Sequence, residues 1–77
     1  MTEGRRHLIA ILQRLRGREL ALRVRVTESA VSHWSSGTYK PSKRARAELA
    51  MQVGIDPDAW DRPALPMHLR PKIQRSL

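Results

Sequence analysis

The sequence predicts an all-α fold of four to five short helices followed by a basic C-terminal tail. Apolar residues recur with a helical period, Gly and Pro separate the periodic segments, and no segment alternates like a strand. At 77 residues without cysteine, the chain must fold on one small apolar core without disulfides. We therefore expect one domain over residues 1–61 and a tail over residues 62–77.

The first helix is predicted from about Arg5 to Arg16, with Gly17 as its stop. Its apolar residues follow the i, i+3, i+4, i+7 spacing of one helix face, namely Leu8, Ile11, Leu12 and Leu15. A second helix of about two turns is predicted from Arg18 to Val24, where the apolar pattern resumes.

The third helix is predicted to begin after Thr27, which suits an N-cap, and to end at Gly37, where a left-handed residue is easiest. Glu28 in its first turn suits the positive end of the helix dipole. Its apolar face consists of Ala30, Val31 and Trp34. Trp34 is therefore expected in the core rather than as a stacking platform.

The fourth helix is predicted from a Ser42 cap to about Val53, closed by Gly54, with Ala45, Leu49, Ala50 and Val53 facing inward. Asp56-Pro57-Asp58 combines a capping carboxylate with Pro at the first helical position, which predicts a short fifth helix. Beyond Asp61, prolines and basic residues without an acid predict an extended or disordered arm, whose apolar residues favour a tethered arm over pure disorder.

The charge limits the classes of partner. Fifteen Lys and Arg against seven Asp and Glu give a net charge of +8, which attracts polyanions such as nucleic acid or an acidic membrane surface. A solvated basic surface that only aids solubility is the alternative. No run of about 18 apolar residues exists, so no membrane span is expected. We expect no signal peptide and a cytoplasmic location, on the nucleoid when DNA is bound.

The most informative stretch joins the second and third helices. Ala21 is small enough for a close helix crossing, and Val26 and Val31 can fill the junction. The outward face is then expected to carry Thr27, Glu28, Ser29, Ser32 and His33. Short polar side chains are unusual on a solvated helix but suit a helix that enters the DNA major groove, which is about 12 Å wide.

Residues 15–42 resemble the XRE-type helix-turn-helix of phage Cro and repressor proteins. The matching residues are Glu19-Leu20-Ala21, the run from Val26 to Trp34, then Gly37 and Lys40-Pro41-Ser42. The helix order extends the resemblance to about Trp60, and it implies a compact lambda-repressor-like DNA-binding domain.

The resemblance also implies roles for single residues. It places base contacts at Thr27, Glu28, Ser29, Ser32 and His33, and phosphate contacts at Thr38, Tyr39, Lys40, Ser42, Lys43 and Arg44. For Glu28 a purely dipolar role stays open, and for His33 a solvated ring stays open.

The chain departs from the family pattern at two positions. Gly17 stands where a phosphate-contacting Gln is common, so Arg16 or Arg18 is expected to replace that contact. Arg25 stands where Gly is common in the turn, and a positive φ there costs about 1 kcal/mol.

The resemblance implies a sequence-specific regulator of transcription that binds double-stranded DNA, in the form of a dimeric repressor of its own or a neighbouring phage or mobile-element operon, on a palindromic operator. Ile55 and Trp60 have two interpretations, an apolar patch for a twofold partner or a cap on the core. The alternative function is an antitoxin whose C-terminal tail binds a protein partner. A third is a basic architectural or membrane-surface peptide.

The residue inventory does not favour an enzyme. His7, His33 and His68 lack the spacing of metal ligands, and no glycine-rich phosphate loop is present. Ser32 and His33 are adjacent in a helix, so their side chains point about 100° apart and cannot act as nucleophile and base. We expect no cofactor and no metal.

Overall fold

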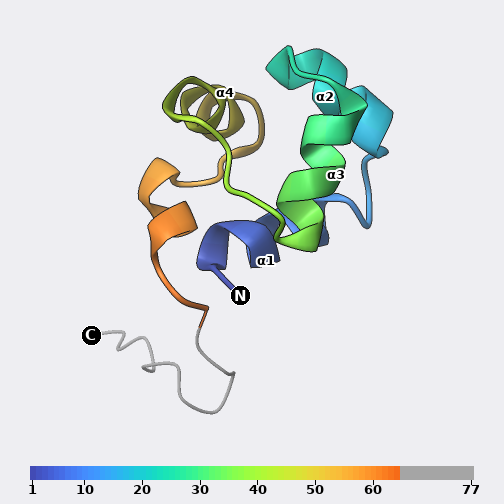
Figure 1. The fold of residues 1–77 in the computed structure, drawn as a ribbon. Coiled ribbons are helices and arrows are strands. Elements are labelled where there is room, and N and C mark those ends of the chain that lie inside the picture. The colour runs from blue at the N-terminus through green and yellow to red at the C-terminus, as the bar shows by residue number, and fades with distance from the viewer. Residues whose placement is uncertain (65–77) are drawn as a thin grey trace, which may run out of the picture.

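Helices account for most of residues 1–64, the part of the chain that the computed structural model describes (Figure 1). The elements are α1 (Glu3–Ile11), α2 (Gly17–Val24), α3 (Glu28–Ser36), α4 (Lys43–Val53) and η1, a 3-10 helix (Pro57–Asp61). Within these residues one isolated bridge between Thr2 and Pro63 is the only β pairing. The all-α prediction is confirmed. Of the tail predicted over residues 62–77, the part beyond Ala64 lies outside the described residues.

The first helix is shorter and earlier than its apolar pattern predicts. Thr2 caps it, since the Thr2 hydroxyl oxygen accepts from the backbone N–H of Arg5 at 3.1 Å, and regular helix ends at Ile11. Residues 12–15 form a turn in which the N–H of Leu15 donates to the carbonyl of Ile11 at 3.0 Å. Leu15 still packs against the core. The predicted extension to Arg16 is therefore wrong, and Gly17 begins α2 instead of ending α1.

The predicted signals at the other helix ends are confirmed. Thr27 and Ser42 cap α3 and α4, their hydroxyl oxygens accepting from the N–H of Ala30 at 3.1 Å and of Ala45 at 3.2 Å. Gly37 and Gly54 close the same helices with φ of 82° and 77°. Within residues 1–64 no helix is long and apolar enough to cross a bilayer.

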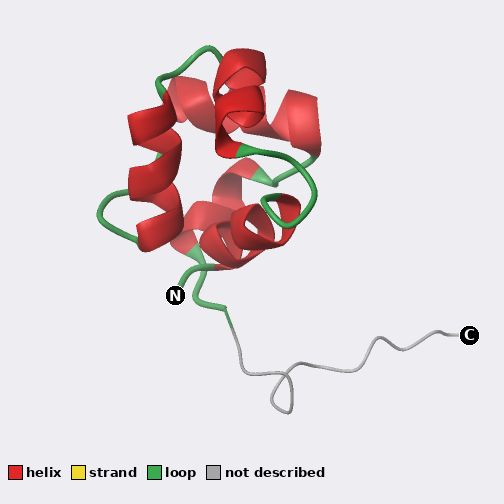
Figure 2. Cartoon of the chain, turned by 90° about the vertical axis from the view of Figure 1, so that its right-hand side faces the viewer, coloured by secondary structure: helices red, strands yellow, loops and turns green. Residues whose placement is uncertain are grey.

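The helices enclose one apolar core. α2 packs against α3 and α4, α1 packs against α3 and η1, and η1 also contacts α4. Figure 2 shows from the side that the helices surround a common centre. The buried apolar residues are Leu8, Leu20, Ala21, Val24, Val31, Trp34, Ala45, Leu49, Ile55, Ala59 and Trp60. Every helix contributes, so the orientation of α3 depends on the whole domain.

Gly4 allows α1 to approach η1 closely. It is buried, and a Cβ at this position would overlap the indole ring of Trp60. Trp60 is only 1 % exposed, and its Nε1 has no hydrogen-bond partner among the described residues. The position therefore requires glycine for space, because any side chain would push the two elements apart.

The last described residues are attached to the first ones. The N–H of Glu3 donates to the carbonyl of Arg62, and the N–H of Ala64 donates to the carbonyl of Met1, both at 2.8 Å. The Arg62 guanidinium also pairs with Glu3 at 2.9 Å and with Asp56 at 3.1 Å. Residues 62–64 therefore pack with the domain, beyond the predicted boundary at residue 61.

Candidate nucleic-acid interface

The turn between α2 and α3 consists of Arg25, Val26 and Thr27. Arg25 adopts the left-handed conformation with φ 63° and ψ 49°, so it carries the steric cost of about 1 kcal/mol expected for a positive φ. The N–H of Val26 donates to the carbonyl of Ala21 at 3.0 Å, which closes α2. Arg44 donates from Nη2 to the carbonyl of Arg25 at 3.3 Å. The start of α4 thus holds the turn in place.

The junction of the two helices is filled as predicted. Ala21 is 4 % exposed and Val31 is 2 % exposed, and Val26 is partly buried against them and the core. Trp34 is 4 % exposed and belongs to the core, which confirms that prediction. One side of α3 is therefore fixed inside the domain, and its other side is left outward.

The outward side of α3 carries short polar groups. Thr27, Glu28, Ser29 and Ser32 are all exposed, and His33 is half-buried beside them. The Thr27 oxygen already accepts the capping bond from Ala30, which leaves its O–H as a donor. Side chains this short let the helix backbone come close to a ligand surface, and the hydroxyls can bond to base edges or phosphates.

His33 is joined to the loop after α3. Its Nδ1 lies 2.8 Å from the hydroxyl oxygen of Tyr39, and the two ring centroids are 4.8 Å apart with a tilt of 36°. Sequence reasoning assigned these residues to base and phosphate contacts separately. The structure brings them together.

Other polar groups continue this surface towards α4. The Thr38 hydroxyl lies 2.8 Å from that of Ser36, and Ser42 caps α4 with its own hydroxyl. Lys43 and Arg44 follow in the first turn and are exposed. The N-terminus of α4 therefore combines free backbone N–H groups with one ammonium and one guanidinium group, which is a favourable place for phosphate oxygens.

Lys40 differs from Lys43 because an acid holds it. Its Nζ lies 3.2 Å from Oδ1 of Asp61, and Arg46 donates to the same carboxylate at 2.8 and 3.3 Å. The hydrogen bond from Arg46, followed by that from Lys40, lowers the pKa of Asp61 below its ordinary value. Asp61 thus pairs with Lys40, an expected phosphate contact, and with the neighbouring Arg46, and a phosphate must compete with it for both.

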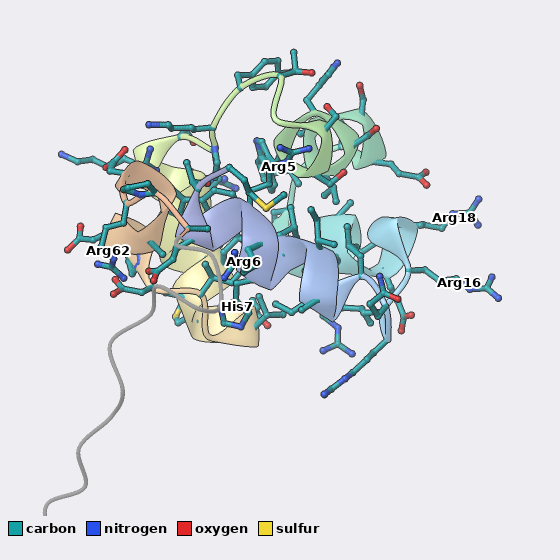
Figure 3. The ribbon with its side chains drawn as sticks, turned by 90° about the horizontal axis from the view of Figure 1, so that it is seen from below. Arg5, Arg6, His7, Arg16, Arg18 and Arg62 are labelled. Atoms are coloured by element: carbon teal, nitrogen blue, oxygen red, sulfur yellow. The ribbon has the colours of Figure 1, made fainter. Side chains whose placement is uncertain are left out.

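Arg16 and Arg18 lie at the other end of the candidate surface, where α2 begins. Both are exposed, and Figure 3 shows their side chains extending away from the body of the domain. Arg16 occupies the N-cap position without a side-chain capping bond. The first N–H groups of α2 are therefore flanked by two cations in place of a capping side chain, which favours an anion.

Sequence reasoning missed the residues that position this surface. Arg5 points from α1 towards α3 (Figure 3) and donates from Nε to the Ser35 carbonyl at 2.7 Å. Asp61 neutralises Lys40 from a distance of 21 residues in the chain. No spacing rule covers such separations, so only the folded arrangement reveals these partners.

Ile55 and Trp60 pack inside the domain. Their exposed fractions are 0 % and 1 %, so neither presents surface to a second copy. Of the two interpretations drawn from the sequence, the core cap agrees with this placement and the partner patch does not. Large apolar side chains that are exposed within residues 1–64 lie elsewhere, among them Leu22 and Met51 at 74 % and 73 %.

Compared with family models, curated proteins and solved structures, the chain has no significant match among them. Its function must therefore be inferred from the residues and their arrangement.

Proposed function

We propose that the chain is a helix-turn-helix protein that binds double-stranded DNA through the outward side of α3. The observation that carries the proposal is the arrangement of α2 and α3. Ala21, Val26 and Val31 seat α3 by one side, while Thr27, Ser29 and Ser32 stay exposed on the other. A helix held this way can enter a major groove without disturbing the core.

The proposed contacts divide by chemistry. Base edges are contacted by the side chains of Thr27, Glu28, Ser29, Ser32 and His33, which combine hydroxyls, one carboxylate and one imidazole. Phosphates are contacted from both flanks of α3, by Arg16, Arg18, Thr38, Lys40, Ser42, Lys43 and Arg44. Tyr39, which the resemblance places among them, is left out because its hydroxyl lies 2.8 Å from Nδ1 of His33. Phosphate contacts set affinity and register, whereas base contacts set sequence preference.

The proposed role is repression of transcription, of its own or a neighbouring operon. A domain of this size acts most simply by covering the DNA to which it binds. Two copies on a palindromic operator are part of the proposal, with a dimer contact formed by residues other than Ile55 and Trp60, because both are buried.

The first test measures sequence preference. Binding sites are selected from random duplex DNA with the full chain, and affinities are measured by fluorescence anisotropy for the selected and a scrambled duplex. Ser29→Ala is expected to lose about 1–3 kcal/mol on the selected site if Ser29 contacts a base. Gln52→Ala, which removes an exposed polar group near the other end of α4, is the matched control and should change nothing. Equal affinity of the wild type for both duplexes contradicts sequence-specific reading.

The second test measures phosphate contact. Lys43→Ala should lower the slope of log K against log salt by about 0.9. Arg14→Ala removes the same charge from a site near Val53, at the opposite end of α4, and should leave the slope unchanged. A similar change in both variants points to net charge alone and contradicts a localised interface.

A further inference from the structure

The contact between His33 and Tyr39 determines which nitrogen of the His33 ring is free to bind a ligand. A neutral imidazole has one N–H and one bare nitrogen, and which nitrogen carries the proton depends on its neighbours. Nδ1 of His33 lies 2.8 Å from the Tyr39 hydroxyl, so this nitrogen is already engaged. Only Nε2 is left to bind anything else.

The direction of the hydrogen bond decides what Nε2 offers. The Tyr39 phenol has one O–H to donate, and a bare imidazole nitrogen is a better acceptor than a phenol oxygen. The favoured arrangement therefore has Tyr39 donating to Nδ1, with the proton of the ring on Nε2. Among residues 1–64 no other hydrogen bond involves either ring, so nothing described opposes this arrangement.

The contact between the rings also limits their motion. Their centroids are 4.8 Å apart, and the hydrogen bond joins a residue of α3 to one in the following loop. A half-buried imidazole held at both its nitrogen and its face loses less conformational freedom when a ligand binds.

We propose that Tyr39 is a positioning residue that holds His33 in the Nε2–H form, so that His33 presents only a donor to DNA. This inference rests on the proposed function of α3. A donor selects acceptors, which in the major groove are guanine O6 and N7, adenine N7 and thymine O4. The amino groups of adenine and cytosine are disfavoured at that position. Tyr39 thereby influences sequence preference without itself contacting a base.

The tautomer is tested first, without DNA. Nitrogen NMR of the histidine rings in the full chain, in mildly alkaline buffer, distinguishes a protonated from a bare Nδ1. The wild type should show His33 with bare Nδ1 and protonated Nε2. Tyr39→Phe keeps the ring but removes the hydroxyl, and should move His33 towards a mixture of both forms. His7 serves as the internal control and should not change. A protonated Nδ1 in the wild type, or no change in Tyr39→Phe, overturns the inference.

The role in binding is tested with a double-mutant cycle on the selected duplex. Tyr39→Phe should weaken binding about three- to tenfold, the range expected for one hydrogen bond, with an unchanged salt slope. In a His33→Ala background the same change should have no further effect. An equal loss in both backgrounds means that Tyr39 contacts DNA directly and overturns the positioning role. A wild type that binds no DNA overturns the proposed function, while the NMR result still decides the tautomer.

Discussion

Arg5 in α1 and Ser35 in α3 are joined by a hydrogen bond from the Arg5 Nε to the Ser35 carbonyl at 2.7 Å. The carbonyl belongs to the last turn of α3, where backbone acceptors lack helical partners and a positive charge is favourable. The Arg5 guanidinium also lies next to Gly37, since a Cβ built at Gly37 would lie 3.0 Å from Nη1 of Arg5. This contact fixes the C-terminal end of α3, opposite the end that Thr27 caps.

Removing this contact should loosen α3. We expect Arg5→Ala to lower the free energy of unfolding by about 1–2 kcal/mol, because a partly buried, charged hydrogen bond is lost. Urea denaturation followed by circular dichroism measures the change. Arg14→Ala removes the same side chain from an exposed position and should have little effect. Equal losses in the two variants are the result that contradicts a specific role for Arg5.

Gly4 and Gly17 make a matched pair. Gly4→Ala should destabilise the domain by about 1–3 kcal/mol despite the better helix propensity of alanine, because its Cβ overlaps the Trp60 ring. A Cβ at Gly17 would lie 3.9 Å from a Val31 methyl carbon, which is ordinary contact. Gly17→Ala should be neutral or slightly stabilising, and thermal melts of both variants measure the difference. A Gly4→Ala variant as stable as the wild type rules out the close approach of α1 to η1.

Arg25 is the non-glycine residue with positive φ in the described chain. Replacing it with glycine should stabilise the domain by about 1 kcal/mol, because glycine adopts this conformation without steric cost. Arg25→Ala removes the charge but keeps the steric cost, and should give no such gain. Denaturation midpoints of the three proteins separate the two effects. A gain of the same size in Arg25→Ala would point to charge repulsion instead.

Acid should weaken the domain through Asp56 and Asp61. The backbone N–H of Asp58, then Arg62, lowers the pKa of Asp56, and Arg46, then Lys40, lowers that of Asp61. A carboxyl whose pKa is lower in the folded state stabilises the fold at any pH above its unfolded-state pKa. This contribution is lost as the pH falls through the folded-state pKa. The free energy of unfolding should therefore decline as the pH falls below 3.8, the ordinary pKa of an aspartate.

Thermal melts between neutral and strongly acidic pH measure this decline. In Asp61→Asn the decline should be shallower, because the neutral amide no longer titrates. Asp58→Asn is the control, since its side chain makes no hydrogen bond among the described residues, and it should follow the wild type. A wild type whose melting temperature does not change through the acid range contradicts this account.

Asp61 should also restrain DNA binding. Asp61→Asn releases Lys40 and Arg46 from the carboxylate, so the salt slope of binding to non-specific duplex should steepen by about 1 as a further cation reaches phosphate. Asp58→Asn changes the net charge equally without freeing either side chain. If both variants bind alike in a salt titration, Asp61 does not compete with phosphate.

The parts of the fold that local chemistry determines could be predicted from sequence. Thr27 and Ser42 cap helices because a hydroxyl at that position satisfies a free N–H, and Gly37 and Gly54 end helices because their backbone is left-handed. The positions of the apolar residues in α3 predict its buried side, and the polar residues on the opposite side are therefore expected to be exposed. These features depend on neighbours within a few residues.

Features that depend on distant neighbours could not be predicted. Leu15 continues the apolar spacing of α1 and still packs on the core, so periodicity alone did not reveal that regular helix ends at Ile11. Trp60 could cap a core or cover a partner on sequence grounds, and only its contact with Gly4 decides that it is buried. The same is true of Tyr39, whose bond to His33 depends on the path of the loop between them.

The antiparallel bridge between Thr2 and Pro63 gives the domain one further property. Entry and exit of the described chain are adjacent, as Figures 1 and 2 both show. Because the first and last described residues of the domain are adjacent, a host protein could carry the domain as an insertion in a surface loop without separating the two ends of that loop. Joining residues 1 and 64 through a short linker should likewise permit new termini at an exposed loop without strain on the core.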